Sequence, residues 1–263
     1  HLIELTYCTK CQLNQVHIAW YTFPMNIVFF DTETTGIDER DVLCQLAWMH
    51  NGVMHDGLYK PPFPIPPESS AVHHISNKMV ANKPAFKDAP EYAEIKALFE
   101  DENTVVVAHN AKFDLAMLAK EGIVPKNHIC TLRVARAMDP EGTLSNYKLQ
   151  YLRYKLDLEV DETAAAHSAD GDVLVLEKLF ERLYDKLKTQ KNGDEPLKEM
   201  MEISNLPSII KTFNFGKHAG KTVAEVAKSD AGYLDWLLKS KLENSPDDED
   251  WIYTLKVSLG RLA

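Results

Sequence analysis

The stretch Ile27-Val28-Phe29-Phe30-Asp31-Thr32-Glu33-Thr34-Thr35-Gly36 decides the fold. Four apolar residues run directly into two acids and a glycine, which is the pattern of a buried strand that ends in a turn. Side chains two positions apart on a strand project from the same face, so Asp31 and Glu33 should lie together. Two adjacent buried negative charges are costly unless a cation compensates them. The stretch therefore indicates a metal site, and the alternative is a strand that ends in a solvated acidic loop.

Two further acids follow the ends of predicted elements. The apolar run 104–108 predicts a central parallel strand, and His109-Asn110-Ala111-Lys112-Phe113-Asp114 follows it and opens a helix. The longest helical pattern covers 164–184, with His167 and Asp172 near its start. These two side chains can share a site only if His167 lies at or before the helix cap. Alternatively, Asp172 is a first-turn carboxylate that the helix dipole favours.

The other patterns predict a mixed sheet with a proline-rich exit. Residues 42–49 and 53–59 are predicted strands, joined by a type I′ turn at Asn51-Gly52. The first three strands are then antiparallel. Prolines between 61 and 67 take the chain out of the sheet as an extended connection that carries His73. We also expect a fifth strand over 129–131, a helix from there to Met138, and helices over 91–100 and 147–156.

Composition and charge restrict the class of protein. The 263 residues are 45% hydrophobic and 26% charged, which is typical of globular proteins, and no apolar run approaches the roughly 18 residues of a membrane span. The net charge of −10 would argue against a nucleic-acid partner if it were evenly spread. Residues 206–263 carry eight basic and eight acidic residues, so the first 205 hold all of it. Four cysteines without a paired spacing pattern indicate a reducing, cytoplasmic compartment.

The chain divides into four predicted segments. Residues 1–24 are interpreted as an N-terminal extension or an expression-derived segment, because Cys8 and Cys11 lack the two further ligands of a zinc site. The main domain is expected over 25–187 and a polar linker over 188–204, within which 197–203 could form a helix. A small C-terminal domain is expected over 205–263.

Three motifs in this order resemble the signature of the DnaQ-like 3′-to-5′ exonucleases: Asp31-x-Glu33, His109-Asn110-x-x-Phe113-Asp114 and His167-x-Ala169-x-x-Asp172. The resemblance covers 25–187 and implies an α/β, ribonuclease H-like fold, a five-stranded mixed sheet with helices on both faces. It also implies two divalent ions, Mg²⁺ or Mn²⁺, held by Asp31, Glu33, Asp114 and Asp172, with His167 as general base. Oxygen-only ligands do favour these hard ions over Zn²⁺, and a histidine with a pKa of about 6.5 suits proton removal at neutral pH.

The resemblance also implies contacts with the nucleic acid. In this family the loop after the first acidic pair, a histidine downstream and the second motif lie beside the 3′-terminal nucleotide, which corresponds here to Thr34, Gly36, Ile37, His73, Asn110 and Phe113. The alternative for Ile37 and Phe113 is that they are ordinary loop and core residues.

The C-terminal part extends the resemblance. Residues 205–240 look like the small C-terminal domain of the bacterial exodeoxyribonuclease X branch of this family. Four lysines and one acid between 211 and 228 give a net charge of +3, and Lys217 and Lys221 are candidates for phosphate contacts. The nearby aromatic residues are expected in a small core. Residues 247–250, all acidic, are expected to form a solvated loop.

These observations predict a metal-dependent exonuclease that removes nucleoside monophosphates from DNA 3′ ends, in repair or recombination. One alternative is a polymerase-proofreading or RNA-trimming exonuclease on the same scaffold, because tolerance of a 2′-hydroxyl cannot be read from the motifs. The other is a non-catalytic nucleic-acid-binding module. DNA with a 3′ end is the expected partner, a membrane is not, and the sequence leaves open a homodimer.

Overall fold

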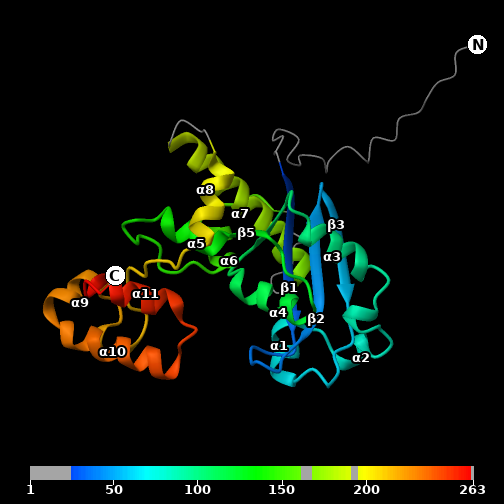
Figure 1. Cartoon of the computed structure of the whole chain (residues 1–263), viewed down its shortest axis with the longest axis horizontal. Helices are drawn as coiled ribbons and strands as arrows, with labels where there is room; N and C mark the ends of the chain where they lie inside the picture. Colours follow the sequence, from blue (N-terminus) through cyan, green and yellow to red (C-terminus); the bar gives the residue numbers. More distant parts are fainter. Residues whose placement is uncertain (1–24, 161–167, 191–194, 262–263) are drawn as a thin grey trace, which may run out of the picture.

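The computed structural model describes residues 25–160, 168–190 and 195–261 (Figure 1). Its centre is a five-stranded sheet in the order β3-β2-β1-β4-β5. β1 pairs antiparallel with β2 and parallel with β4, β2 pairs antiparallel with β3, and β4 pairs parallel with β5. This is the predicted ribonuclease H-like arrangement. The strands are β1 Asn26–Thr34, β2 Leu43–His50, β3 Val53–Leu58, β4 Thr104–Ala108 and β5 Asn127–Cys130.

The turn between β2 and β3 is the predicted one, because Asn51 and Gly52 have φ values of 51° and 74°, as a type I′ turn requires.

The helices follow the predicted pattern with a few differences. Thr131, predicted at the end of the fifth strand, instead begins a helix. In the catalytic domain the helices are α1 Pro67–His73, α2 Asn77–Val80, α3 Tyr92–Glu100, α4 Lys112–Lys120, α5 Thr131–Ala137, α6 Leu149–Lys155, α7 Ala169–Gln190 and α8 Pro196–Ser204, with a 3₁₀ turn at Phe86–Asp88.

The placement of His73 on an extended connection was wrong. The segment 61–66 is irregular, as its prolines require, but Pro67 begins α1. Proline fits this first helical position because the N–H that it lacks would have no partner there. His73 is therefore the last residue of α1, and the next residue, His74, ends the helix in the left-handed conformation with φ 63°.

Two hydrophobic cores cover the two faces of the sheet. On one face Phe29 packs against Phe180 of α7, with ring centroids 5.3 Å apart. On the other face Phe30 packs against Phe99 of α3 at 5.5 Å. Full burial of each such side chain contributes about 1.5–3 kcal/mol. Alternate residues of β1 are thus committed to opposite cores, and the odd-numbered ones face α7.

Most of the predicted linker over 188–204 is helical. α7 continues to Gln190, and α8 buries Leu197 and Met200 in the core on the α7 side of the sheet. The hydroxyl of Ser204 accepts a hydrogen bond of 2.8 Å from the backbone N–H of Cys130. This part of the chain is therefore packed on the sheet rather than suspended between two domains.

The C-terminal unit is a small helical unit beside the catalytic domain (Figure 1). It contains a 3₁₀ turn at Gly216–His218, α9 Val223–Ser229, α10 Ala231–Asn244 and α11 Glu249–Ser258. Phe213 is buried at its centre against Trp251, with ring centroids 4.9 Å apart. Of the neighbouring aromatic residues predicted in this core, Trp236 is 58% exposed.

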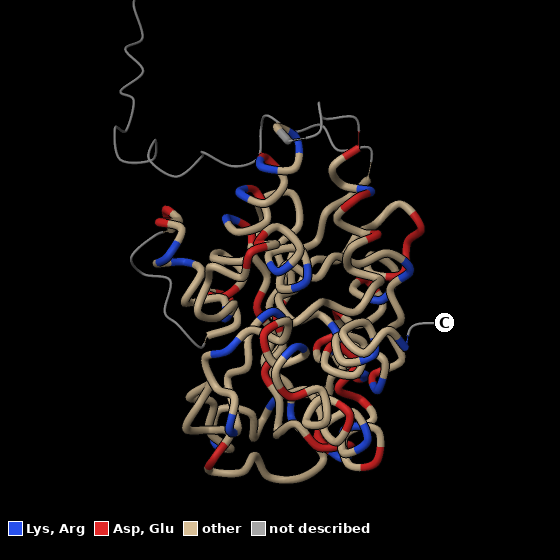
Figure 2. Tube along the Cα trace, turned by 90° about the vertical axis from the view of Figure 1, so that its left-hand side faces the viewer, with Lys and Arg blue, Asp and Glu red and all other residues tan. Residues whose placement is uncertain are grey.

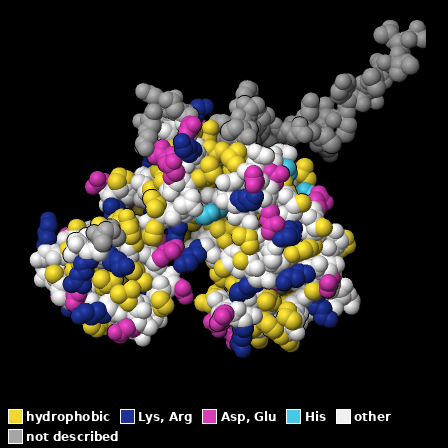
Figure 3. All heavy atoms as spheres, in the orientation of Figure 1, with side chains coloured by type: hydrophobic (Ala, Val, Ile, Leu, Met, Phe, Trp, Pro, Cys, Tyr) yellow, Lys and Arg dark blue, Asp and Glu magenta, His cyan; other side chains and the backbone are white. Residues whose placement is uncertain are grey.

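Ion pairs connect this unit to the catalytic domain. Arg133 pairs with Glu249, Arg136 pairs with Asp250 at 2.5 Å, and Lys112 donates to the carbonyl oxygen of Asp247 at 2.8 Å. In Figure 3 acidic and basic side chains adjoin where the two lobes meet. Residues 247–250, which we call the acidic clamp, are thus an interface and not the solvated loop that their charge suggested.

Elsewhere the described residues show neither a large surface of one charge nor a long apolar helix. Figure 2 shows acidic and basic residues interspersed along most of the described trace. Among the helices that the structure describes, none has the length and apolar character that crossing a bilayer would need. Because the described basic residues do not gather into one large surface in this view, contacts with a nucleic acid have to be inferred from individual side chains.

Candidate active site

Three carboxylates from distant parts of the chain meet at the end of β1. Asp31 and Glu33 continue the face of β1 that packs on α7, and α7 carries Asp172 in its first turn. One carboxylate oxygen from each of the three lies within 4.8 Å of the others. The alternation of the strand and the start of α7 thus bring acids together that are about 140 positions apart in the sequence.

Asp114 approaches the same place from the other side. It lies in the first turn of α4, is only 3% exposed, and its Oδ1 accepts hydrogen bonds from Thr32 Oγ1 at 2.6 Å and from the Thr32 backbone N–H at 3.1 Å. Its charge also contributes to the pKa shifts of Asp31 and Glu33. β1, α4 and α7 therefore each supply carboxylates to one acidic site.

The site has uncompensated negative charge. Burial, followed by the charges of Asp114, Asp172 and Glu33, raises the pKa of Asp31 well above its usual value. Burial and the charges of Asp172 and Asp114 raise the pKa of Glu33 to about 8. Burial raises the pKa of Asp114 to about 7, although the hydrogen bonds from Thr32 oppose the shift. These carboxyl groups would bind protons at neutral pH unless a cation replaced them.

The donor set fits a hard divalent cation. All the converging ligands are carboxylate oxygens, which Mg²⁺, Mn²⁺ and Ca²⁺ prefer and which are poor matches for soft metals. Asp31, Glu33 and Asp172 could hold one ion, and Asp114 adds a fourth carboxylate beside them. The thiol of Cys44 near Glu33 does not compete as a ligand, because burial raises its pKa to about 12.

Gln150 belongs to this site although the sequence analysis did not select it. It lies near the start of α6, and its amide Nε2 donates to Asp172 Oδ1 at 2.5 Å. This bond fixes the Asp172 carboxylate. A single glutamine in an amphipathic segment gives no sequence signal for such a role. His167, the predicted general base, lies outside the described residues.

The predicted substrate residue His73 lies under the loop that follows the acidic pair. Its Nδ1 accepts from the backbone N–H of Ile75 at 3.0 Å, so Nε2 carries the proton and donates to the carbonyl oxygen of Thr34 at 3.2 Å. Burial is the main reason that its pKa lies below the usual value. Both ring nitrogens are thus used within the protein, and His73 holds the Thr34 backbone in place.

The loop after Thr34 is tightly closed and presents one apolar side chain. Thr34 Oγ1 donates to the carbonyl oxygen of Gly36 at 2.7 Å. A Cβ atom on Gly36 would lie 2.4 Å from a carboxylate oxygen of Asp41, so a larger residue would displace this carboxylate from its hydrogen bonds with Thr35 and Asp38. The next residue, Ile37, is 84% exposed. An isoleucine held so openly beside the acids is available to a ligand.

The other predicted contacts are divided between two places. Asn110, exposed with a φ of 62°, and the half-buried Phe113 lie where β4 leads into α4, beside Asp114. Lys217 and Lys221 are exposed on the small C-terminal unit. Lys217 Nζ pairs with Asp230 at 2.8 Å and lies 4.9 Å from the centre of the Tyr233 ring. The structure therefore places Asn110 and Phe113 near the acids, whereas Lys217 and Lys221 lie on the other unit.

The bond between Thr32 and Asp114 can be tested with a matched pair of substitutions. Thr32→Val removes a donor from a buried carboxylate and is expected to destabilise the Mg²⁺-loaded protein by about 1.5–3 kcal/mol. Thr104, on the adjacent β4, is the control, because its buried hydroxyl has no hydrogen-bond partner among the described residues. Thr104→Val should cost nothing or stabilise. Urea denaturation of both variants measures the difference, and equal effects would show that the Thr32 bond has no special weight.

Comparison with known proteins agrees with this geometry. The family described as Exonuclease matches residues 28–180, and the family described as Exodeoxyribonuclease X-like C-terminal matches residues 213–240. The chain is 35% identical to exodeoxyribonuclease 10 of Escherichia coli K12 over 221 residues, covering 82% of this chain and 92% of that protein. It is 34% identical to a DNA polymerase III subunit epsilon-like protein of Rhodobacter capsulatus, covering 63% of this chain and 25% of that protein.

Solved structures have the same fold. A structure described as exonuclease X in complex with 5′ overhanging duplex DNA superposes with a TM-score of 0.52 at 24% identity, covering 68% of this chain and 99% of that one. A structure of exonuclease I superposes with a TM-score of 0.51 at 22% identity, covering 64% of this chain and 44% of that one. From its family match, its similarity to exodeoxyribonuclease 10 and its converging acids, the chain belongs to the DnaQ-like exonuclease family, with an exodeoxyribonuclease X-like C-terminal region.

Proposed function

We propose that this protein is a metal-dependent 3′-to-5′ exodeoxyribonuclease that releases nucleoside monophosphates from DNA 3′ ends. The observation that carries the proposal is the convergence of Asp31, Glu33 and Asp172, with Asp114 beside them, in a member of the exonuclease family. DNA is the proposed substrate because the relative that matches most of both chains is named an exodeoxyribonuclease. The C-terminal match to the same branch supports this choice.

The proposed cofactor is a pair of Mg²⁺ or Mn²⁺ ions. When bound, such ions supply an activated water molecule and neutralise charge on the attacking and leaving oxygens of a phosphodiester. Asp31, Glu33, Asp114 and Asp172 are the proposed ligands. His167 is the proposed general base that takes the proton from the water, and Gln150 keeps the Asp172 carboxylate in place.

The 3′-terminal nucleotide is proposed to lie beside the loop after β1. Ile37 is exposed enough to pack against a base, while the bond from His73 to Thr34 holds the backbone before it, and the absence of a side chain at Gly36 lets Asp41 approach that backbone closely. Asn110 and Phe113 are proposed to contact the same nucleotide from the start of α4. Lys217 and Lys221 are proposed as more distant phosphate contacts.

The proposal extends to the setting of the protein. The proposed domains are an N-terminal extension or expression-derived segment over 1–24, the exonuclease domain over 25–187, the connection over 188–204 that contains α8, and the small C-terminal domain over 205–263. A cytoplasmic location and a role in DNA repair or recombination fit its chemistry. Among the described cysteines, Cys44 and Cys130 are both free and buried, as expected in a reducing compartment.

The test uses DNA and RNA oligonucleotides of the same sequence, labelled at the 3′ end. With Mg²⁺, the intact protein is expected to release labelled mononucleotides from DNA, and EDTA is expected to stop the release. Preferential shortening of RNA would preserve the chemistry but reject the DNA assignment. Labelled products longer than mononucleotides would indicate internal cleavage or degradation from the 5′ end, and no product from either strand would reject an exonuclease activity.

A further inference from the structure

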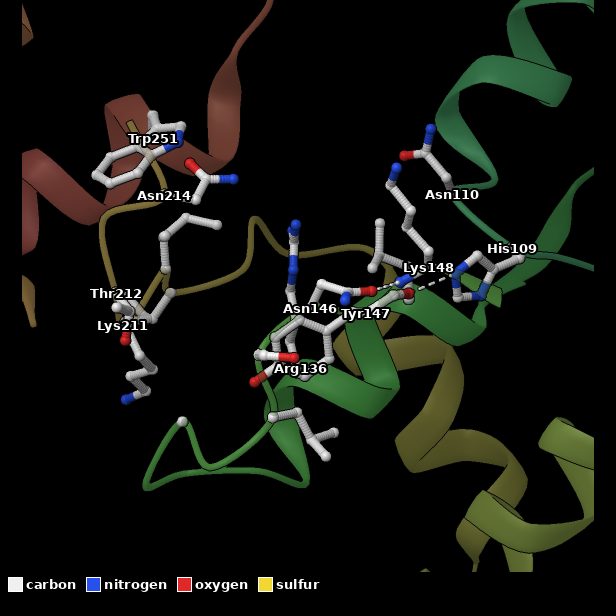
Figure 4. Close-up of a pocket in the computed structure, with 16 residues that line it drawn as sticks. His109, Asn110, Arg136, Asn146, Tyr147, Lys148, Lys211, Thr212, Asn214 and Trp251 are labelled. Atoms are coloured by element: carbon white, nitrogen blue, oxygen red, sulfur yellow. Dashed lines mark hydrogen bonds between the residues drawn. The ribbon is translucent and has the colours of Figure 1, made fainter. Parts of the chain in front are cut away.

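A cleft lies between the catalytic domain and the C-terminal unit (Figure 4). Its volume is about 460 Å³. One wall comes from Asn110, Arg136 and the segment 142–148, and the other comes from 209–214 and Trp251. The motifs that define the family do not include these walls, apart from His109 and Asn110.

The charge of this cleft differs from that of the whole chain. The protein has 39 acidic and 29 basic residues, yet the described lining of the cleft contains Arg136, Lys148 and Lys211 and no Asp or Glu. A neighbouring cleft of about 410 Å³ shares Asn110 but is lined by the four acids of the acidic clamp together with Lys112 and Arg133. The acids outnumber the cations there, so a polyanion leaving the site near Asn110 is attracted to the 460 Å³ cleft rather than to its neighbour.

Two of the three cations are available to a ligand. Arg136 pairs with Asp250 of the clamp, so its charge is offset. Lys148 and Lys211 have no ion-pair partner in the part of the chain that the structure describes. In Figure 4 the Lys148 side chain extends toward Asn110, whereas the Lys211 amine lies at the outer rim. The two ammonium groups thus mark the two ends of the cleft.

The position of Lys211 depends on close contact between the two units. A Cβ atom on Gly142 would lie 2.7 Å from Lys211 Cβ, so the lysine stem passes directly over a glycine, whose φ is +66°. The amides of Asn146 and Asn214 face the space between the walls (Figure 4). Such groups donate hydrogen bonds to phosphate and sugar oxygens, and these contacts carry no sequence information.

The cleft is connected to the acidic site by residues that are neighbours in the sequence and by hydrogen bonds. Asn110 lies four positions before Asp114, and Lys148 lies two positions before Gln150, which bonds Asp172. The carbonyl oxygen of Tyr147 is bonded to His109 Nε2 at 2.8 Å, which fixes this wall to the end of β4. A strand with its last phosphodiester at the acids would enter the cleft next.

We propose that this cleft binds the sugar–phosphate backbone of the DNA strand on the 5′ side of the bond to be cleaved, with Lys148 and Lys211 as phosphate contacts. The inference rests on the proposed exonuclease function, because it takes the acids as the position of the 3′ end. The C-terminal unit then forms one wall of the path that the strand follows. Its function in this arrangement is to lengthen the binding site.

Equilibrium binding of fluorescent deoxythymidylate dodecamer and dinucleotide, measured by anisotropy in EDTA over a range of salt concentrations, tests the proposal. The full-length protein is compared with the double variant Lys148→Gln/Lys211→Gln. For the dodecamer, loss of two phosphate contacts should reduce the slope of log K against log salt by about 1.4, since a single strand loses about 0.7 per contact. The affinity advantage of the dodecamer over the dinucleotide should shrink in the same variant.

Lys228→Gln is the matched control, because Lys228 is exposed on α9 of the same unit and outside the lining of the cleft. The full-length protein, the double variant and the control variant all retain the acidic clamp. Any effect of salt on the clamp therefore contributes equally to the three slopes. An unchanged slope in the double variant, or an equal reduction in Lys228→Gln, would overturn the proposal. Nucleotide release with Mg²⁺ is measured on the same preparations: salt-dependent binding through the cleft without release would reject the proposed function and leave the cleft assignment intact.

Discussion

Asp31→Asn is expected to lower the rate of nucleotide release from DNA at least about 10³-fold. Asp31 is the residue on which the charges of the other three acids converge, and its replacement removes a charged ligand from the centre of the cluster. Metal-ion charge stabilisation contributes several kcal/mol to such reactions, and about 4 kcal/mol corresponds to 10³-fold. Asp114→Asn should give a loss of the same order. Release of labelled mononucleotides at saturating Mg²⁺ measures both.

Asp170→Asn provides the control for these variants. Asp170 lies in the first turn of α7, two positions before Asp172, but it is exposed. The same chemical change at this position should leave the rate within about twofold, because exposed charges are screened by solvent. Melting curves would establish that all three variants are folded. Retained release in Asp31→Asn or Asp114→Asn would remove that residue from the mechanism.

The free energy of unfolding should fall as the pH rises and should increase when a divalent ion is added. In EDTA the raised pKa values of Asp31, Glu33 and Asp114 mean that the folded protein binds more protons than the unfolded chain between about pH 4 and pH 8. The contribution of these acids to stability is therefore greatest in the acid part of this window and is lost as the pH rises toward 8. Mg²⁺ at about 100 times its Kd should restore about 2.7 kcal/mol, or about 5–10 °C in melting temperature.

The clearest readout is the melting temperature at pH 8 with and without Mg²⁺. Asp31→Asn should melt at a higher temperature than the unsubstituted protein in EDTA, because it relieves repulsion, and it should gain much less from Mg²⁺. Asp170→Asn should respond to Mg²⁺ as the unsubstituted protein does. A melting temperature that neither Mg²⁺ nor Mn²⁺ changes would argue that the four carboxylates do not form a metal site.

Local patterns were sufficient to predict the sheet. The apolar run before Asp31, the Asn51-Gly52 turn and the continuous run 104–108 each report short-range preferences, and the strands lie where these patterns place them. The convergence of Asp31, Glu33 and Asp172 was predicted for a different reason. It was implied by the resemblance of the three motifs to the exonuclease signature, and the structure brings these carboxylates together.

The features that escaped prediction depend on contacts between distant segments. The bond from Gln150 to Asp172 joins two helices, and nothing in either segment specifies it. Residues 247–250 have the composition of a solvated loop, and Lys112, Arg133 and Arg136, more than 110 positions earlier, give them partners on the catalytic domain. The helix α1 was missed because prolines were taken as breakers, although the last of them is a favoured first helical residue.

The acidic clamp implies that a fragment of this protein is not simply a smaller version of it. Residues 206–263 are neutral in total, so their removal would leave the net charge unchanged. It would nevertheless leave Arg133, Arg136 and Lys112 on the catalytic domain without the clamp residues that now pair with them. A truncated enzyme would thus lose one wall of its strand path while gaining a bare cationic surface that attracts any polyanion. If such a fragment kept its affinity for DNA, that affinity would report binding to the newly exposed cations. Point substitutions in the intact chain are therefore the sounder way to alter DNA binding.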